Sequence, residues 1–173
     1  MQETKCFFQH SVSSPFFPQV IQKLPPATAA LMPITATLGT VGQTGLTALF
    51  GVEEDAKPKA GDVVVVSSAA GAVGSVAAQL CKKRGCFVVG LCGSDEKATW
   101  LEDYLGLDVG LNYKSDSFAE DLAAVTPDVS NDGGSEEGGV NVYWDNVGGE
   151  ISDTVIRLMG RGGHVVLCGQ ISM

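Results

Sequence analysis

A glycine-rich turn between an apolar run and a helix-like segment is the part of the sequence best suited to chemistry. Residues 69–74 read Ala-Ala-Gly-Ala-Val-Gly, which is the pattern G-x-G-x-x-G with alanine in place of the first glycine. Gly71 lets the backbone approach a pyrophosphate, and Gly74 lets the helix pack closely on the preceding strand. The N–H groups of Ala72 and Val73 would point at phosphate oxygens, which the helix dipole also attracts. The turn predicts a dinucleotide site, although an ordinary strand-to-helix turn is compatible with the same pattern.

A second polar cluster follows about 20 residues further on, where a dinucleotide site contacts the ribose. Residues 90–97 read Gly-Leu-Cys-Gly-Ser-Asp-Glu-Lys, so the expected strand tip lacks the acidic side chain that binds a ribose 2′-hydroxyl in NAD-binding domains. Ser94 and Lys97 lie one helical turn apart and can face one phosphate. The cluster predicts NADP(H) rather than NAD(H), with Lys97 as the selecting cation. A serine cap followed by a solvated lysine is the alternative.

No pattern for a metal or a disulfide framework is found. The cysteines and histidines are Cys6, Cys81, Cys86, Cys92, Cys168, His10 and His164. None of the cysteines forms a C-x-x-C pair, and the histidines are far from any cysteine cluster, which argues against a zinc site. Cys81 and Cys86 are expected to be small buried side chains.

Apolar runs alternate with helix-like segments from residue 61 onward, and this alternation must position the two polar clusters. The expected strands are residues 63–66, 87–91, 109–111, 140–144 and 164–168. The expected helices are residues 38–52, 74–84, 94–104, 117–125 and 151–159. Strands separated by helices predict a parallel sheet with right-handed crossovers. The expected fold is a doubly wound, Rossmann-like α/β domain in three α/β/α layers.

Two segments are expected to be irregular. Residues 1–37 contain several prolines, which exclude a long helix. Their phenylalanines at positions 7, 8, 16 and 17 are expected to pack on something outside this segment. Residues 127–139 are acidic and glycine-rich, and they are expected to form a surface loop.

Composition limits the possible partners. The net charge of −9 disfavours nucleic-acid binding, because neutralising phosphates needs a basic surface. No apolar run reaches the roughly 18–20 residues that span a bilayer, and the N-terminus lacks the pattern of a signal peptide. We therefore expect a cytoplasmic protein without a membrane partner.

The motifs together match a known family. The chain resembles the zinc-independent medium-chain dehydrogenase/reductases, closest to the prostaglandin reductases (15-oxoprostaglandin 13-reductases or alkenal/one reductases), and among these to the second type, prostaglandin reductase 2. The matching motifs are residues 45–48, 69–75, 93–97, 112–114, 145–149, 151–156 and 167–172. They follow the order of the family and cover roughly residues 38–173.

The resemblance implies an activity and a role for each cofactor-binding residue. It implies NADPH-dependent reduction of the C=C bond of α,β-unsaturated ketones such as 15-keto-prostaglandins, with hydride transfer to the β-carbon. Lys97 would bind the 2′-phosphate, with Ser94 and Tyr113 near the adenosine end. Asn146 and Cys168 would line the nicotinamide side. A rim aromatic, a turn residue and a packing side chain are the alternatives for Tyr113, Asn146 and Cys168 respectively.

The domain boundaries expected from the resemblance leave the catalytic residue outside the chain. Residues 1–37 would be the remnant of an N-terminal catalytic domain, and residues 38–173 an NADP(H)-binding domain truncated at its C-terminus. A tyrosine beyond Met173 would polarise the substrate carbonyl. We accordingly expect little or no reductase activity from this chain alone.

Two other functions remain open at this point. One is an NADPH-binding module without catalysis, which the phenylalanines near the N-terminus would support as a homodimer interface. The other is a quinone oxidoreductase of the same superfamily. The expected partner in the main interpretation is a small-molecule enone or lipid substrate, with a possible homodimer.

Overall fold

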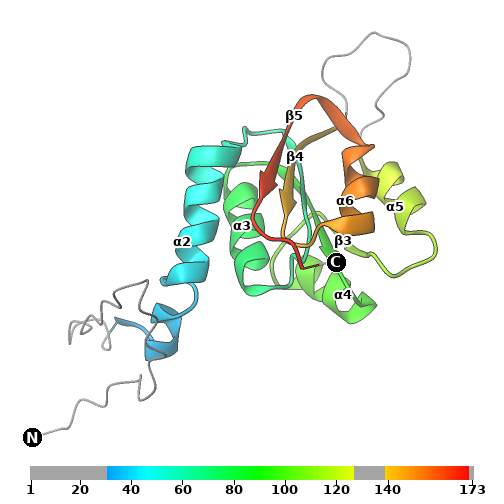
Figure 1. Cartoon of the computed structure of the whole chain (residues 1–173). Coiled ribbons are helices and arrows are strands. Elements are labelled where there is room, and N and C mark those ends of the chain that lie inside the picture. Colours follow the sequence, from blue (N-terminus) through cyan, green and yellow to red (C-terminus); the bar gives the residue numbers. More distant parts are fainter. Residues whose placement is uncertain (1–30, 127–138, 172–173) are drawn as a thin grey trace, which may run out of the picture. The chain divides into compact units, whose positions relative to one another are not determined.

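The computed structural model describes residues 31–126 and 139–171 (Figure 1). The chain divides into two units, residues 1–34 and 35–173, and the second unit contains the elements that follow. The expectations for the N-terminal phenylalanines and for most of the acidic loop fall outside the described residues. The end of the first expected irregular segment is a short 3-10 helix, η1 (Ile34–Thr37).

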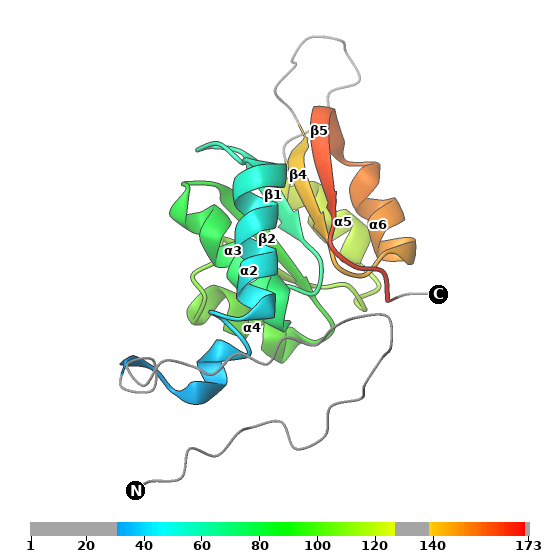
Figure 2. The same cartoon turned by 60° about the vertical axis from the view of Figure 1, so that its left-hand side comes forward.

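A parallel sheet forms the centre of the second unit. Its strands are β1 (Val63–Val66), β2 (Phe87–Cys92), β3 (Val109–Asn112), β4 (Val140–Asp145) and β5 (Met159–Leu167). They lie in the order β3-β2-β1-β4-β5, and every neighbouring pair is parallel (Figures 1 and 2). The order reverses at β1, so the predicted doubly wound fold is confirmed. All the strands end at one edge of the sheet, where such folds bind ligands.

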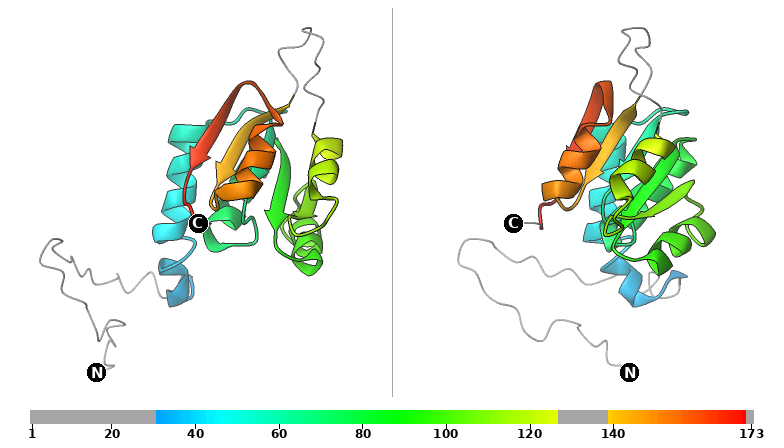
Figure 3. Two further views of the ribbon diagram at one scale, coloured as in Figure 1. Left: turned by 45° about the vertical axis from the view of Figure 1, so that its right-hand side comes forward. Right: turned by 90° about the vertical axis from the view of Figure 1, so that its right-hand side faces the viewer.

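Helices cover both faces of the sheet (Figure 3). They are α2 (Gln43–Phe50), α3 (Ala72–Lys83), α4 (Asp95–Asp103), α5 (Phe118–Val125) and α6 (Gly149–Ile156). Val64 and Val66 of β1 join the cluster under α2, α3 and α4, whereas Val63 and Val65 join the cluster under α5 and α6. Alternate residues of a strand point to opposite faces, so the continuous valine run serves two cores. The three-layer prediction is confirmed.

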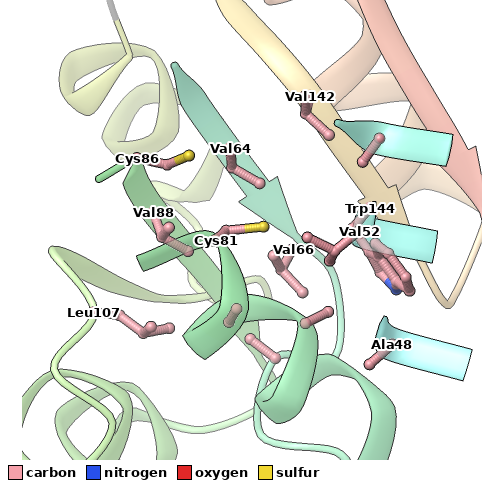
Figure 4. Close-up of a cluster of buried hydrophobic side chains, with 14 of the residues drawn as sticks. Ala48, Val52, Val64, Val66, Cys81, Cys86, Val88, Leu107, Val142 and Trp144 are labelled. Atoms are coloured by element: carbon pink, nitrogen blue, oxygen red, sulfur yellow. The ribbon is translucent and has the colours of Figure 1, made fainter. Parts of the chain in front are cut away.

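The helix expected over residues 38–52 is interrupted. Residues 38–42 form turns, α2 begins only at Gln43, and a π-helix η2 (Gly51–Ala56) continues it. A Cβ at Gly51 would collide with the ring of Trp144, so glycine is required where this helix crosses β4. Figure 4 shows Trp144 beside Ala48 and Val52 in the buried cluster.

The predicted boundary between α6 and β5 is also wrong. The helix begins earlier, at Gly149, and β5 begins at Met159 rather than at His164. Met159 pairs with Val140, and an irregularity between Val140 and Val142 absorbs the glycines that follow. The start of this strand was missed in the sequence because these glycines give no apolar pattern.

The core contains the two cysteines that were expected there. Cys81 and Cys86 are 1% and 2% exposed, and Figure 4 shows both among the valines of β1 and β2. Burial raises the pKa of Cys81 to about 12, so this thiol is protonated and unreactive at neutral pH. No helix in the described part of the chain has the length and apolarity to cross a membrane.

The contact between α3 and the end of β1 gives a first prediction. A Cβ at Gly74 would collide with the carbonyl oxygen of Ser68, so Gly74→Ala should lower the free energy of unfolding by about 1–3 kcal/mol. Gly39→Ala is the control, because the only atom near its Cβ position is the Thr35 oxygen, at 3.9 Å. Urea unfolding of both variants measures the difference. Equal stability would contradict the close packing of α3.

Candidate functional site

The turn after β1 is anchored to the strands on both sides. The Ser67 N–H donates to the Trp144 carbonyl of β4 at 3.0 Å. The Ala69 N–H donates to the Leu91 carbonyl of β2 at 2.9 Å. Ala69 is fully buried, and its methyl group lies 3.0 Å from the Cβ position of Gly90. An alanine in place of the first glycine of the motif is therefore accommodated by a glycine on the neighbouring strand.

The backbone of this turn is built for close approach. A Cβ at Gly71 would lie 3.0 Å from both the carbonyl and the hydroxyl oxygen of Ser68. Ser68 has a φ of +50°, in the left-handed region that side chains rarely occupy. Gly71 caps α3 without a side-chain hydrogen bond, and within the described residues the N–H groups of Ala72 and Val73 have no acceptor. The helix start thus presents free donors to an anion.

The expected ribose end lies at the tips of β2 and β3. Ser94 caps α4, with its Oγ accepting from the Lys97 N–H at 3.4 Å. This confirms the predicted cap. Tyr113 covers the strand tip, because a Cβ at Gly93 would lie 2.9 Å from its hydroxyl oxygen. Lys97 is exposed. The structure thus brings Ser94 and Tyr113 together at Gly93 and places Lys97 on the first turn of the helix that Ser94 caps.

A further lysine at this end was not predicted. Cys92 and Asn112 are partners in the register of β2 and β3, so the residues after them are neighbours. The Cε of Lys114 lies 3.5 Å from the Cβ position of Gly93. The signal for Lys114 was present in the sequence as a cation three residues beyond the expected third strand, but only the strand pairing shows what it faces.

A cavity of about 620 Å³ lies next to the ribose end. Its lining residues come from the segment after β3, the start of α5, the turn after β4 and α6, and they are Tyr113, Phe118, Val147, Gly148, Gly149, Glu150, Ile151 and Thr154. Pockets for small molecules have volumes of roughly 300–1,000 Å³. Only Tyr113 among the lining residues was predicted to bind a cofactor. Most of the others lie in the family motifs at residues 145–149 and 151–156, but no binding role was predicted for them, because they converge only when α5 and α6 pack on the same face.

Asn146 and Cys168 lie at the other side of the turn after β1. The Asn146 Nδ2 donates to the Ser67 carbonyl at 2.6 Å, and its Oδ1 accepts from the Trp144 Nε1 at 3.2 Å. These bonds fix the amide and agree with the turn role that was the alternative. The Cys168 N–H donates to the Asp145 carbonyl at 2.8 Å, and burial raises the pKa of the Cys168 thiol. Contact with a cofactor stays a prediction for both residues.

Asp145 holds this side of the site together. Its Oδ1 accepts from the N–H groups of Val147 and Gly148, both at 2.9 Å, and from the Ser67 hydroxyl at 3.2 Å. Its Oδ2 accepts from the Ser152 hydroxyl at 2.6 Å. The residue is only 3% exposed. A buried carboxylate was not predicted, since an aspartate at the end of a strand is usually solvated.

Hydrogen bonds keep this buried carboxylate ionised. Burial by itself would raise its pKa, but donors from Ser152, Gly148 and Val147 together lower the pKa of Asp145 below its usual value. Burial raises the pKa of Tyr143 to about 12, so its hydroxyl remains a donor to Asp145 at 3.1 Å. The anion therefore fixes the turn in which Gly148 has a φ of +75°.

Comparison with known sequences assigns the family. The model of the family described as zinc-binding dehydrogenase matches residues 72–173. The chain belongs to this family. Prostaglandin reductase 1 of Oryctolagus cuniculus is 44% identical over 165 residues, which are 95% of this chain and 43% of the relative. Prostaglandin reductase 1 of Rattus norvegicus is 46% identical over 88% of this chain and 43% of its own length.

These matches confirm the resemblance to prostaglandin reductases among the medium-chain dehydrogenase/reductases. The assignment to the second type stays a prediction, since both of these relatives are named as the first type. The chain spans less than half the length of these relatives. The proposed domain boundaries are therefore not tested by them.

A solved structure supports the same assignment. CurA from Vibrio vulnificus, in complex with NADPH, is 39% identical, with a TM-score of 0.71 over 79% of this chain and 38% of that chain. A second crystal structure of CurA from the same organism gives a TM-score of 0.72 at 38% identity, over 81% of this chain and 38% of that chain. The similarity includes the five-stranded sheet and its flanking helices.

The described residues do not fit the zinc ion of the family's name. Within residues 31–126 and 139–171, no group of three His, Cys, Asp or Glu side chains could hold a metal. Cys81 and Cys86 are buried in the hydrophobic core and are not at the sheet edge where the parallel strands end. No step of the chemistry below is therefore assigned to a metal.

The Asp145 network predicts a loss of stability that depends on pH. Asp145→Asn should lower the free energy of unfolding by about 2–4 kcal/mol at pH 7, because an amide cannot replace a buried anion with these donors. The folded pKa is depressed, so the advantage of the wild type is full above the unfolded pKa of about 4 and is lost as the pH falls through the folded value.

Asp153→Asn is the matched control, because Asp153 is exposed and lies on the same helix as Ser152. It should change the free energy of unfolding by less than about 0.5 kcal/mol. Urea unfolding between about pH 3 and about pH 8, a range that includes the unfolded pKa of about 4, measures both variants. An Asp145→Asn protein that is as stable as the control at pH 7 would show that the network is not formed.

Proposed function

We propose that this chain is the NADP(H)-binding domain of an oxidoreductase that reduces the C=C bond of α,β-unsaturated ketones. The observation that supports this best is the combination, at one sheet edge, of free donors at the start of α3 with an exposed lysine at a strand tip that carries no carboxylate. The first suits a pyrophosphate and the second suits a 2′-phosphate. The relatives named prostaglandin reductase and the NADPH complex of CurA are consistent with it.

The pyrophosphate is assigned to the turn between β1 and α3. Gly71 allows the close approach, Gly74 lets α3 pack on the end of β1, and the N–H groups of Ala72 and Val73 donate to the phosphate oxygens. The dipole of α3 favours the negative charge at this point. The side-chain-free cap of α3 fits this role, because a serine or aspartate there would compete for the same donors.

The adenosine end is assigned to the tips of β2 and β3 and to the neighbouring cavity. Lys97 and Ser94 bind the 2′-phosphate, and Tyr113 separates this phosphate from the cavity that it also lines. The cavity, which Phe118 and Ile151 help to line, is assigned to the adenine ring. A carboxylate at Gly93 would repel the 2′-phosphate, so its absence is part of the selectivity.

The nicotinamide side is assigned to the ends of β4 and β5. NADPH supplies a hydride to the β-carbon of the enone when it is bound. Asn146 is held by Ser67 and Trp144, so its position next to the phosphate turn is fixed before the cofactor arrives. Cys168 contributes its backbone and a neutral thiol. Such preorganisation would spare this side of the site from reorganising during the hydride transfer.

The substrate class is proposed from the relatives. An enone is favoured over a quinone as acceptor, because two relatives that cover 95% and 88% of this chain are named prostaglandin reductase. These relatives imply a small-molecule substrate, and 15-keto-prostaglandins are the proposed example. The homodimer and the cytoplasmic location stay predictions.

Titration of the purified chain with NADPH and with NADH tests the cofactor assignment. We expect NADPH to bind at least about tenfold more tightly, which is about 1.4 kcal/mol. Lys97→Ala should reduce this preference, while Lys83→Ala should leave it unchanged. Lys83 is an exposed lysine at the opposite end of α3, so its removal changes the net charge equally. Cofactor fluorescence or titration calorimetry gives both dissociation constants.

Two results would contradict the proposal. Equal affinities for NADPH and NADH in the wild type would remove the 2′-phosphate site. A Lys97→Ala protein with the full preference for NADPH would show that the phosphate is bound elsewhere. Circular dichroism of each variant establishes that the comparison is made between folded proteins.

A further inference from the structure

Lys114 is a second exposed cation at the end of the sheet where the 2′-phosphate is proposed to bind. Lys114 follows the end of β3 by two residues, whereas Lys97 belongs to α4, so the two lysines come from different parts of the fold. Its Cε lies 3.5 Å from the Cβ position of Gly93, next to the Tyr113 hydroxyl over the same glycine. The Lys114 side chain therefore lies close to Gly93, and Lys97 lies on the first turn of the helix that Ser94 caps, although the two lysines are far apart in the sequence.

The position of Lys114 is fixed by hydrogen bonds of Asn112. The Lys114 N–H donates to the Asn112 Oδ1 at 3.1 Å. The Nδ2 of the same amide donates to the Asp95 carboxylate at 2.8 Å. Asn112 thus holds the backbone of Lys114 and also donates a hydrogen bond to one carboxylate oxygen of Asp95, the residue after Ser94.

The charges at this end have no ion-pair partner in the described part of the chain. The ion pairs found there involve Lys82, Arg84 and His164, and neither Lys97 nor Lys114 takes part in one. Two lysines without an ion pair at this end of the sheet are unexpected in a chain with a net charge of −9. Repulsion between them is relieved when a dianion lies between them.

We propose that Lys114 is a second binding residue for the 2′-phosphate and that it shares the selection of NADPH with Lys97. The inference rests on the proposed function and deepens it. A phosphate dianion at Gly93 would accept from the Ser94 hydroxyl and from both ammonium groups. Charge-assisted hydrogen bonds of this kind are stronger than neutral ones. NADH has no group at this position, so Lys114 contributes nothing to its binding.

The test compares four variants of the full chain: Lys114→Ala, Lys97→Ala, the double variant and Lys114→Arg, with Lys83→Ala as the matched control. The probes are NADPH and NADH, and also 2′-AMP and 5′-AMP, which carry the two phosphate positions without a nicotinamide. Lys114→Ala should weaken binding of NADPH and 2′-AMP by about fivefold or more. Binding of NADH and 5′-AMP should change by less than about twofold, which is within the effect of a remote charge.

The remaining outcomes separate this inference from the proposed function. Lys114→Arg should retain most of the NADPH affinity, since it keeps the cation. If the wild type prefers NADPH and Lys97→Ala reduces the preference while Lys114→Ala behaves like Lys83→Ala, Lys114 has no role and only this inference fails. If Lys114→Ala weakens NADH as much as NADPH, its effect is structural and the inference also fails. If the wild type shows no preference for NADPH, both proposals fail.

Discussion

The buried carboxylate of Asp145 is the interaction on which the candidate site depends. It accepts hydrogen bonds from Ser67 at the end of β1, from the turn after β4, and from Ser152 of α6. Ser67 is far in sequence from the other two, and together these parts form the turn between β1 and α3, one wall of the cavity and the support of Asn146. A buried anion whose donors are all present rigidifies its surroundings, whereas the loss of one partner is costly.

Selectivity and overall charge act at different distances in this protein. The net charge of −9 would repel a nucleotide at long range. Within the site, however, the donors of α3 and the lysines at the β2 and β3 tips are close enough to outweigh this field, since screening by salt removes most interactions beyond about 10 Å. The absence of a carboxylate at Gly93 and the hydrogen bond from Asn112 to the Asp95 carboxylate both reduce the repulsion of a phosphate at this position. Affinity for a phosphorylated ribose is therefore a local property of a few residues.

Local sequence signals predicted the parts of the fold that depend on neighbours in the chain. The predicted limits of β1 and the predicted cap at Ser94 agree with the structure. Both depend only on residues that are adjacent in the sequence, namely a run of valines and a serine before acidic residues. The glycines of the phosphate turn were predicted for the same reason. The start of β5 was wrong because strand pairing with Val140, rather than residue type, decides it.

The unpredicted site residues are those whose role depends on packing at long range. The burial of Asp145 follows from the packing of α6 on β4 and from the pairing of β4 with β1, and the place of Lys114 follows from the pairing of β2 with β3. The lining of the cavity likewise requires α5 and α6 on one face. A single sequence contains no signal for such convergence apart from the polar residues at the ends of the expected strands.

The central claim is that a dinucleotide lies across the carboxyl edge of this sheet, and amide NMR of the chain with NADP⁺ tests it most directly. The account predicts that the largest shifts occur at residues 71–74 and 93–97, with further shifts around the cavity at residues 147–151. Amides at the opposite edge, such as those of residues 57–62, should not move. Shifts confined to that opposite edge, or no shifts in a folded protein, would contradict the account.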